Sequence, residues 1–110
     1  MFRFAALAIG SRSMQGSVNK GDIVILDKNS KYPKKGDIIA FKEQGKTIVH
    51  RVVQLKERNG QRVYITKGDA NKNKDNWYIT KGNLIGKVKV RVRWIGWPTV
   101  ALSEMLMNKK

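Results

Sequence analysis

Residues 36–66 read GDIIAFKEQGKTIVHRVVQLKERNGQRVYIT, a stretch in which apolar runs alternate with turn signals. The apolar runs are rich in β-branched residues and cover positions 37–41, 47–56 and 61–66. Between them lie a glycine-containing turn at 43–46 and the pair Asn59-Gly60, which is a strong signal for a two-residue hairpin. This stretch therefore predicts three consecutive antiparallel strands.

The flanking sequence extends the same pattern. Residues 22–26 form a further apolar run that is entered, like the run at 37–41, through Gly-Asp-Ile. Residues 67–82 are a polar loop, and residues 83–95 alternate Val with Lys or Arg as a last strand does. Pro98 ends that strand, and residues 99–107 are expected to form a short helix or a surface-lying tail. The sum is an all-β domain with little helix, either a small, partly closed barrel or two packed antiparallel sheets.

The composition restricts the possible functions. The chain has 110 residues, which suits a single domain, and carries 23 Lys and Arg against 8 Asp and Glu, a formal charge of +15. This excess favours an anionic partner, either nucleic acid or an acidic membrane surface. The basic residues are spread along the chain, which favours a general surface field over a sequence-reading element. With no cysteine and one histidine, neither a disulfide, a metal site nor a cofactor is expected.

The two ends of the chain differ from its middle. The apolar run at residues 4–9 is far shorter than the roughly 20 residues of a membrane-spanning helix. We interpret residues 1–10 as the remnant of an apolar N-terminal segment and residues 98–110 as an apolar and basic tail. Together with the strands between them, they make residues 1–110 one domain.

Four polar residues could form a catalytic group. Ser13 lies in a loop, His50 is the only histidine, and Asp69 and Asp75 follow in the polar loop. A serine, a histidine and a carboxylate supply a nucleophile, a general base and a group that orients the base, in any chain order. His50 lies on a strand with apolar residues on both faces, so we expect it to be half-buried, where the neutral imidazole is favoured. The pattern alone leaves the choice between Asp69 and Asp75 open.

Several segments in order resemble signal peptidase I of the endoplasmic-reticulum type, which also occurs in archaea and spore formers. That family carries Ser-Gly-Ser-Met, two strands entered through Gly-Asp, His-Arg-Val, and Thr-Lys-Gly-Asp-Asn-Asn followed by Asp. The resemblance covers about residues 11 to 100. The corresponding segments here are Ser11-Arg12-Ser13-Met14, Gly21-Asp22, Gly36-Asp37-Ile38, His50-Arg51-Val52, Thr66-Lys67-Gly68-Asp69-Ala70-Asn71 with Asp75, Gly86-Lys87-Val88 and Ile95-Gly96.

The resemblance implies a role for each site residue. Ser13 is the nucleophile, His50 is the base where other members use a lysine, and Asp75 is the orienting acid, with Asp69 as the second candidate. The hydroxyl of Ser11 and the backbone N–H of Ser13 form the oxyanion site, and Met14 lines the substrate pocket.

The resemblance also implies a reaction and a location. The reaction is removal of signal peptides, with small residues one and three positions before the cut, from secreted preproteins at an anionic membrane surface. The domain would be membrane-associated on the extracytoplasmic or lumenal side. Trp94, Ile95, Trp97, Val100 and Leu102 could then dip into the membrane interface.

Departures from the family motif keep alternatives open. The glycine between the two serines is Arg12 here, and the usual Glu-Pro after Met14 is Gln15-Gly16. An inactive relative is one alternative. A nucleic-acid-binding barrel that stacks bases on Trp77, Tyr78, Trp94 and Trp97 is another, although the family has no such role. A self-cleaving repressor-type peptidase shares the small β fold, but those enzymes use a lysine base.

Overall fold

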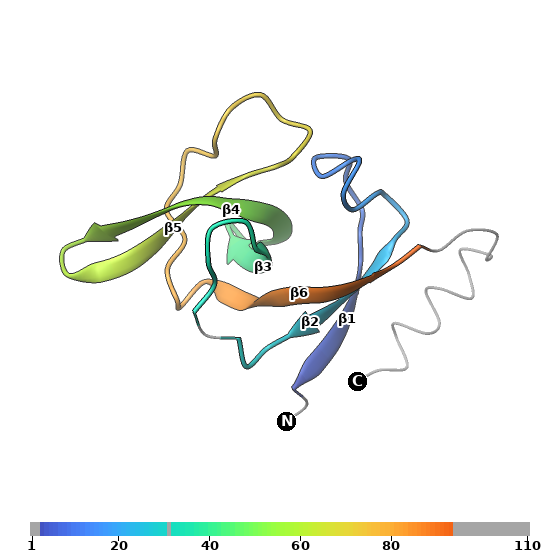
Figure 1. The fold of residues 1–110 in the computed structure, drawn as a ribbon, viewed down its shortest axis with the longest axis horizontal. Helices are drawn as coiled ribbons and strands as arrows, with labels where there is room; N and C mark the ends of the chain where they lie inside the picture. The colour runs from blue at the N-terminus through green and yellow to red at the C-terminus, as the bar shows by residue number, and fades with distance from the viewer. Residues whose placement is uncertain (1–2, 31, 94–110) are drawn as a thin grey trace.

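The computed structural model describes residues 3–30 and 32–93, and in these ranges it contains six strands and no helix. The strands pair antiparallel in a single open sheet in the order β1-β2-β6-β3-β4-β5 (Figure 1). Their bounds are β1 Phe4–Ala8, β2 Ile23–Asp27, β3 Ile38–Glu43, β4 Lys46–Arg58, β5 Gln61–Lys67 and β6 Leu84–Val92.

Two tight turns join the three central strands that the sequence predicts. Gln44 and Gly45 link β3 to β4 with φ values of 53° and 76°, and Asn59 and Gly60 link β4 to β5 with 52° and 77°. Positive φ at both central residues is the geometry whose twist matches that of paired strands, and Gly and Asn adopt it at low cost. These local turns set the registers of β3–β4 and β4–β5.

The sheet carries an apolar cluster on each face. Because side chains alternate along a strand, β3 directs Ala40 to one cluster and Ile39 and Phe41 to the other. The first cluster contains Ile9, Met14, Val18, Val24, Leu26 and Ala40. The second contains Ile39, Phe41, Val52, Tyr64 and Ile79, with Ile48, Trp77 and Leu84 packed against it. The centre of the sheet is therefore covered on both sides, as the two apolar faces of β4 predict.

The all-β prediction is confirmed, but across the described residues the arrangement is a single open sheet in place of either predicted version. One continuous sheet is present, neither closed into a barrel nor divided into two packed sheets. The five predicted strands match β2 to β6 within a few residues. Strand β1 was not predicted: residues 4–8, interpreted as part of an N-terminal remnant, pair along β2 from Phe4↔Asp27 to Ala8↔Ile23. The predicted tail at 98–110 and the helix at 99–107 lie outside the described residues.

Two long loops carry Ser13, Asp69 and Asp75 and lie side by side above the sheet in Figure 1. The first connects β1 to β2 and is closed at its base by bonds from Ile9 N–H to Asp22 O and from Gly21 N–H to Ile9 O. The second leaves β5 and returns to it where Tyr64 and Ile79 exchange backbone hydrogen bonds. Both loops are thus anchored on strands, which fixes their positions over β4.

Candidate active site

His50 is held rigidly in the middle of the sheet. It lies on β4 opposite Ile39 of β3, and only 6% of its surface is exposed. The edge of the Phe41 ring packs against the imidazole at 6.2 Å between ring centroids. His50 is therefore more deeply buried than the half-buried position expected from the sequence, and the Phe41 ring packs against it.

Asp75 is the carboxylate that contacts His50. Its Oδ2 lies 2.6 Å from His50 Nδ1, and both side chains are almost completely buried. An ionised carboxylate only accepts hydrogen bonds, so Nδ1 carries the proton and Nε2 presents its lone pair. The backbone N–H of Asp75 donates to Thr66 O, which brings the loop back to β5 beside β4. Asp75 therefore sets the tautomer of the imidazole.

Ser13 faces the other ring nitrogen. Its Oγ lies 3.0 Å from His50 Nε2, within the range expected for a serine and its general base. Ser11 Oγ is 3.1 Å from Ser13 Oγ. Since the Ser13 hydroxyl donates to Nε2, the Ser11 hydroxyl is the donor in this second bond. Ser13, His50 and Asp75 thus form one continuous row of hydrogen bonds, although Ser13 and Asp75 are 62 positions apart in the chain. Ser11 lies at the Ser13 end of the row.

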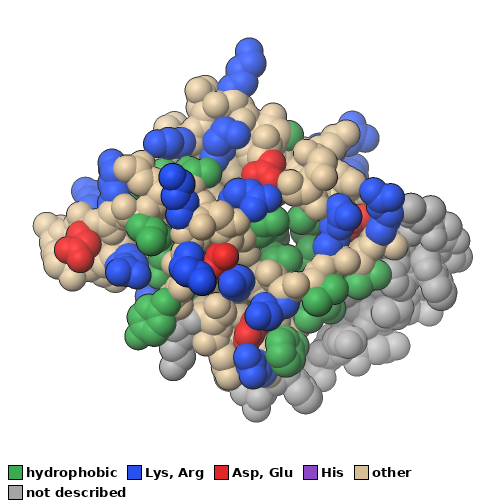
Figure 2. Space-filling model, in the orientation of Figure 1, with side chains coloured by type: hydrophobic (Ala, Val, Ile, Leu, Met, Phe, Trp, Pro, Cys, Tyr) green, Lys and Arg blue, Asp and Glu red, His purple; other side chains and the backbone are tan. Residues whose placement is uncertain are grey.

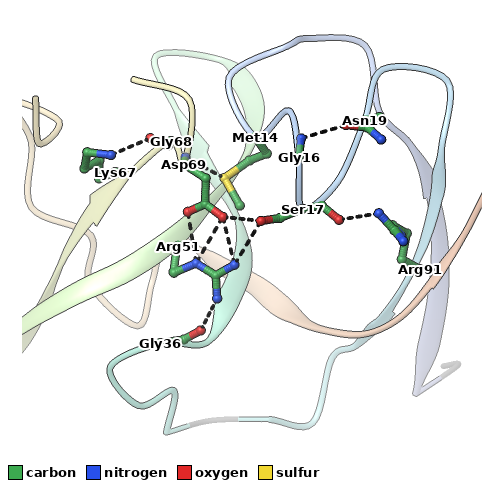
Figure 3. Close-up of polar contacts among 10 residues, drawn as sticks. All are labelled: Met14, Gly16, Ser17, Asn19, Gly36, Arg51, Lys67, Gly68, Asp69 and Arg91. Atoms are coloured by element: carbon green, nitrogen blue, oxygen red, sulfur yellow. Dashed lines mark hydrogen bonds and ion pairs between the residues drawn. The ribbon is translucent and has the colours of Figure 1, made fainter. Parts of the chain in front are cut away.

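Asp69, the second candidate acid, has different partners. It binds Arg51 through Nε and Nη2, at 2.9 Å and 2.8 Å, and also accepts from the Ser17 hydroxyl (Figure 3). Arg51 in turn donates to Gly36 O at 2.7 Å. The hydrogen bond from Arg51 lowers the pKa of the Asp69 carboxyl below its usual value, against the opposing effect of burial and with a smaller contribution from Ser17. Asp69 is therefore held as an anion that ties the two loops to β4.

The loop with Ser13 is also fixed by direct backbone contacts. Ala70 N–H donates to Ser13 O at 2.8 Å. A Cβ on Gly68 would lie 2.7 Å from the same carbonyl oxygen and 3.0 Å from Ser13 Cβ, so only glycine allows this approach. Any larger residue at Gly68 would displace Ser13 relative to His50.

The departures from the family motif are accommodated locally. Gly16 adopts a φ of 103°, and its N–H donates to the side chain of Asn19 (Figure 3). Arg12 is exposed, and its carbonyl accepts from Gln15 N–H. A tight turn thus forms after Ser13 without the usual proline.

A cleft of about 490 Å³ opens at the row of polar residues. One wall comes from the end of β1 and the residues after it, and the other comes from the first half of β4. Its lining residues are Leu7, Ala8, Ile9, Gly10, Ser11, Ser13, Met14, Lys46, Thr47, Ile48, Val49, His50, Asn71, Asp75 and Trp77. Apolar side chains therefore flank the polar row along an open groove.

Met14 has a dual position. It lines this cleft, as expected of a pocket residue, but only 2% of its surface is exposed and most of it packs in the first apolar cluster. Its sulfur accepts a hydrogen bond from Asp69 N–H, drawn in Figure 3. Met14 therefore serves as an anchor for the Ser13 loop as well as part of the cleft floor.

No group of three or more His, Asp or Glu side chains within residues 3–30 and 32–93 is arranged to hold a metal ion. Across the same described ranges, no helix reaches the length and apolarity required to cross a membrane.

Fold and site define a class: a β-sheet protein with a serine, histidine and aspartate in hydrogen-bonded sequence, the arrangement of serine peptidases. Residues 3–97 match the profile of the Peptidase S24-like family, and the chain belongs to this family. Its relatives include the signal peptidase complex catalytic subunits SEC11 of three yeasts. The chain is 34% identical to that of Candida dubliniensis over 90% of its own length and 66% of the relative's. It is 34% identical to the subunit of Lodderomyces elongisporus over 86% of its own length and 63% of the relative's. It is also 34% identical to the subunit of Candida tropicalis, over 90% of its own length and 66% of the relative's.

These comparisons confirm the resemblance to the endoplasmic-reticulum type of signal peptidase. The chain spans slightly less than two thirds of the length of these curated relatives, 63–66%. The sequence did not indicate the residues that hold the loop aspartate Asp69 and the strand residue Thr66 in place, Ser17 and Trp77. Ser17 carries no signal of its own in a loop of ordinary composition, and the sequence suggests only base stacking as a role for Trp77.

Proposed function

We propose that this protein is a serine endopeptidase that removes N-terminal signal peptides from secreted preproteins, with Ser13 as nucleophile and His50 as general base. The observation that carries the proposal is the 3.0 Å contact between Ser13 Oγ and Nε2 of His50. Similarity to catalytic subunits of signal peptidase complexes supports the substrate class. The direct contacts of His50 with both Ser13 and Asp75 speak against the alternative of an inactive relative.

The proposed reaction has two halves. Ser13 Oγ attacks the scissile carbonyl carbon while its proton passes to His50 Nε2, and the imidazolium then protonates the departing amine as the C–N bond breaks. Water next attacks the Ser13 ester, giving a proton to Nε2, and the C–Oγ bond breaks as Ser13 recovers its proton. Asp75 stabilises the imidazolium formed in each half through Nδ1–H. The Ser11 hydroxyl and the Ser13 N–H are the proposed donors to the oxyanion, a contribution of about 10²–10³ in rate for one donor.

The cleft suits an extended peptide. Its two walls come from β1 and β4, and a substrate segment could lie between them as an added strand. Ala8 and Gly10 leave room on one wall, and Ile48 and Val49 offer apolar contacts on the other. Such shallow, apolar subsites accept small side chains, which agrees with small residues before the cleavage site.

The test is cleavage of a preprotein in detergent by the purified chain, with the new N-terminus determined by mass spectrometry. We expect one cut at the end of the signal peptide. A matched preprotein with tyrosine at the position before the cut should remain intact, because the shallow subsite excludes a large ring. If the wild-type chain leaves the first preprotein uncut, the inactive-relative alternative holds.

We further propose that the domain works against an anionic membrane surface, on the extracytoplasmic or lumenal side. The formal charge is +15, and Figure 2 shows Lys and Arg side chains distributed over the face in view. Each basic residue close to an anionic bilayer contributes about 1 kcal/mol of attraction. Trp94 and Trp97, which were expected at the membrane interface, lie outside the described residues.

Sedimentation with lipid vesicles tests this second proposal. The chain should bind phosphatidylserine-containing vesicles at low salt and be released as added salt shortens the Debye length to about 8 Å near physiological ionic strength. Vesicles of phosphatidylcholine alone are the control. Equal binding to both would contradict an electrostatic surface role, and preferential capture by single-stranded DNA at the same salt would favour the nucleic-acid alternative. For that alternative, Trp77 offers little, because it packs against the second apolar cluster.

A further inference from the structure

Thr66 and Trp77 form a second row of hydrogen bonds behind the catalytic carboxylate. Thr66 Oγ1 lies 2.7 Å from Asp75 Oδ2, the same oxygen that contacts His50 Nδ1. Trp77 Nε1 lies 3.2 Å from Thr66 Oγ1. Thr66 is completely buried, on the last part of β5 opposite Val52 of β4.

The direction of each bond follows from the chemistry of the groups. An indole nitrogen can only donate, so Thr66 Oγ1 is the acceptor of the Trp77 N–H. The single hydroxyl hydrogen of Thr66 is then free to point at Asp75, whose carboxylate can only accept. Trp77 therefore donates to Thr66, and both Thr66 and His50 donate to Asp75. The direction of each of these hydrogen bonds is fixed by its donor and acceptor groups.

We propose that Thr66 is a positioning residue, oriented by Trp77, that holds the Asp75 carboxylate in the rotamer in which it binds His50. Asp75 is bound to Thr66 twice, since its own N–H donates to Thr66 O at 2.9 Å. Backbone and side chain of one buried residue thus fix both ends of the aspartate. The expected effect of Thr66 on catalysis rests on the proposed function. Its expected effect on the tautomer of His50 does not depend on that function.

The rings around the row limit its movement. Trp77 packs edge-on against Phe41 at 6.3 Å between centroids, and Phe41 packs in the same manner against His50 at 6.2 Å. Trp77 also lines the cleft beside Asp75. A substrate in the cleft would thus contact the residue that begins the row, while Thr66 stays sealed in the interior.

The experiment compares Thr66→Val, which keeps the shape and removes the hydroxyl, with Thr66→Ser, which keeps the hydroxyl. The first readout is the ¹⁵N NMR spectrum of the imidazole above pH 7.5, which is unambiguous because His50 is the only histidine. We expect the wild type and Thr66→Ser to show the Nδ1–H tautomer. Thr66→Val should show a mixture of both tautomers, since the carboxylate is no longer held against Nδ1.

The second readout is preprotein cleavage. Thr66→Val should lower kcat by roughly tenfold to a hundredfold at nearly constant KM, because misplacing a catalytic group acts on the chemical step. Thr66→Ser should keep at least about half of the wild-type kcat, and Trp77→Phe, which loses only the N–H, should fall between the two. A single Nδ1–H tautomer in Thr66→Val, with a native unfolding transition, would overturn the proposal. If the wild type cleaves no preprotein, the proposed function fails and the tautomer measurement alone decides the role of Thr66.

Discussion

Alanine at Ser13 or at His50 should abolish preprotein cleavage, with kcat lowered by at least about 10⁴-fold in each case. Ser13→Ala removes the hydroxyl oxygen that lies 3.0 Å from His50 Nε2 in the cleft. His50→Ala leaves a neutral hydroxyl with no base to take its proton, and such a hydroxyl is a poor nucleophile near neutral pH. Single-turnover kinetics on a preprotein with a labelled mature region would measure both losses.

The double variant sharpens this prediction. Because nucleophile and base act in the same step, Ser13→Ala combined with His50→Ala should be no slower than either single variant. Ser30→Ala is the matched control, since this serine lies in the β2–β3 connection, outside the cleft lining, and should keep wild-type activity. Substantial cleavage by either single variant would show that the activity belongs to another site or to a contaminant.

Asp75→Asn should lower kcat by about 10³- to 10⁴-fold with the fold intact. The asparagine can turn its NH₂ group toward His50 Nδ1, which then becomes the acceptor and leaves the hydrogen on Nε2. A protonated Nε2 cannot take the proton of Ser13, so the base is present in the wrong tautomer. Steady-state kinetics for Asp75→Asn and Asp69→Asn, measured with the same preprotein, provide the comparison. Equal kcat values for the two variants would leave the acid unassigned.

Asp69→Asn should instead reduce stability, with kcat lowered by no more than about tenfold. It leaves the guanidinium of Arg51 partly buried without its carboxylate, at a cost of about 1–3 kcal/mol in the free energy of unfolding. The pKa of Asp69 is lower in the folded state than in the unfolded state, where it is about 3.9. The stabilisation is therefore complete above that pH and is lost as the pH falls through the lower, folded-state pKa.

Urea unfolding of the wild type and Asp69→Asn between pH 2 and 7 measures this stabilisation. The difference in stability should be constant from about pH 5 upward and should shrink as the pH falls through the lowered, folded-state pKa of Asp69. A difference that persists unchanged at the acid end would mean that the carboxylate charge of Asp69 is not its source.

Much of the fold was predictable because its determinants are local. The turns before and after β4 contain Gly45 and the pair Asn59-Gly60, which tolerate positive φ, and β4 between them follows from its length and β-branched content. Strand β1 was missed because Phe4–Ala8 is a short run without alternation in which three of the five residues are alanine, a residue depleted in strands. Its identity as a strand depends on pairing with β2. The position of β6 between β2 and β3 likewise depends on pairing between strands that are far apart in the sequence, which no local pattern encodes.

By itself, the sequence of this protein determined the all-β class, the strands β2 to β6 and the set of residues from which an active site could be made. The residue pattern left two aspartates of one loop open and the family resemblance favoured Asp75, but only the tertiary structure showed that Asp75 contacts His50. Asp69 and Asp75 have the same chemistry and similar surroundings in sequence, so the choice depends on the path of the loop. That path is set by long-range backbone bonds, from Ala70 to Ser13 and from Asp75 to Thr66, which place Asp69 beside Arg51 and Asp75 beside His50.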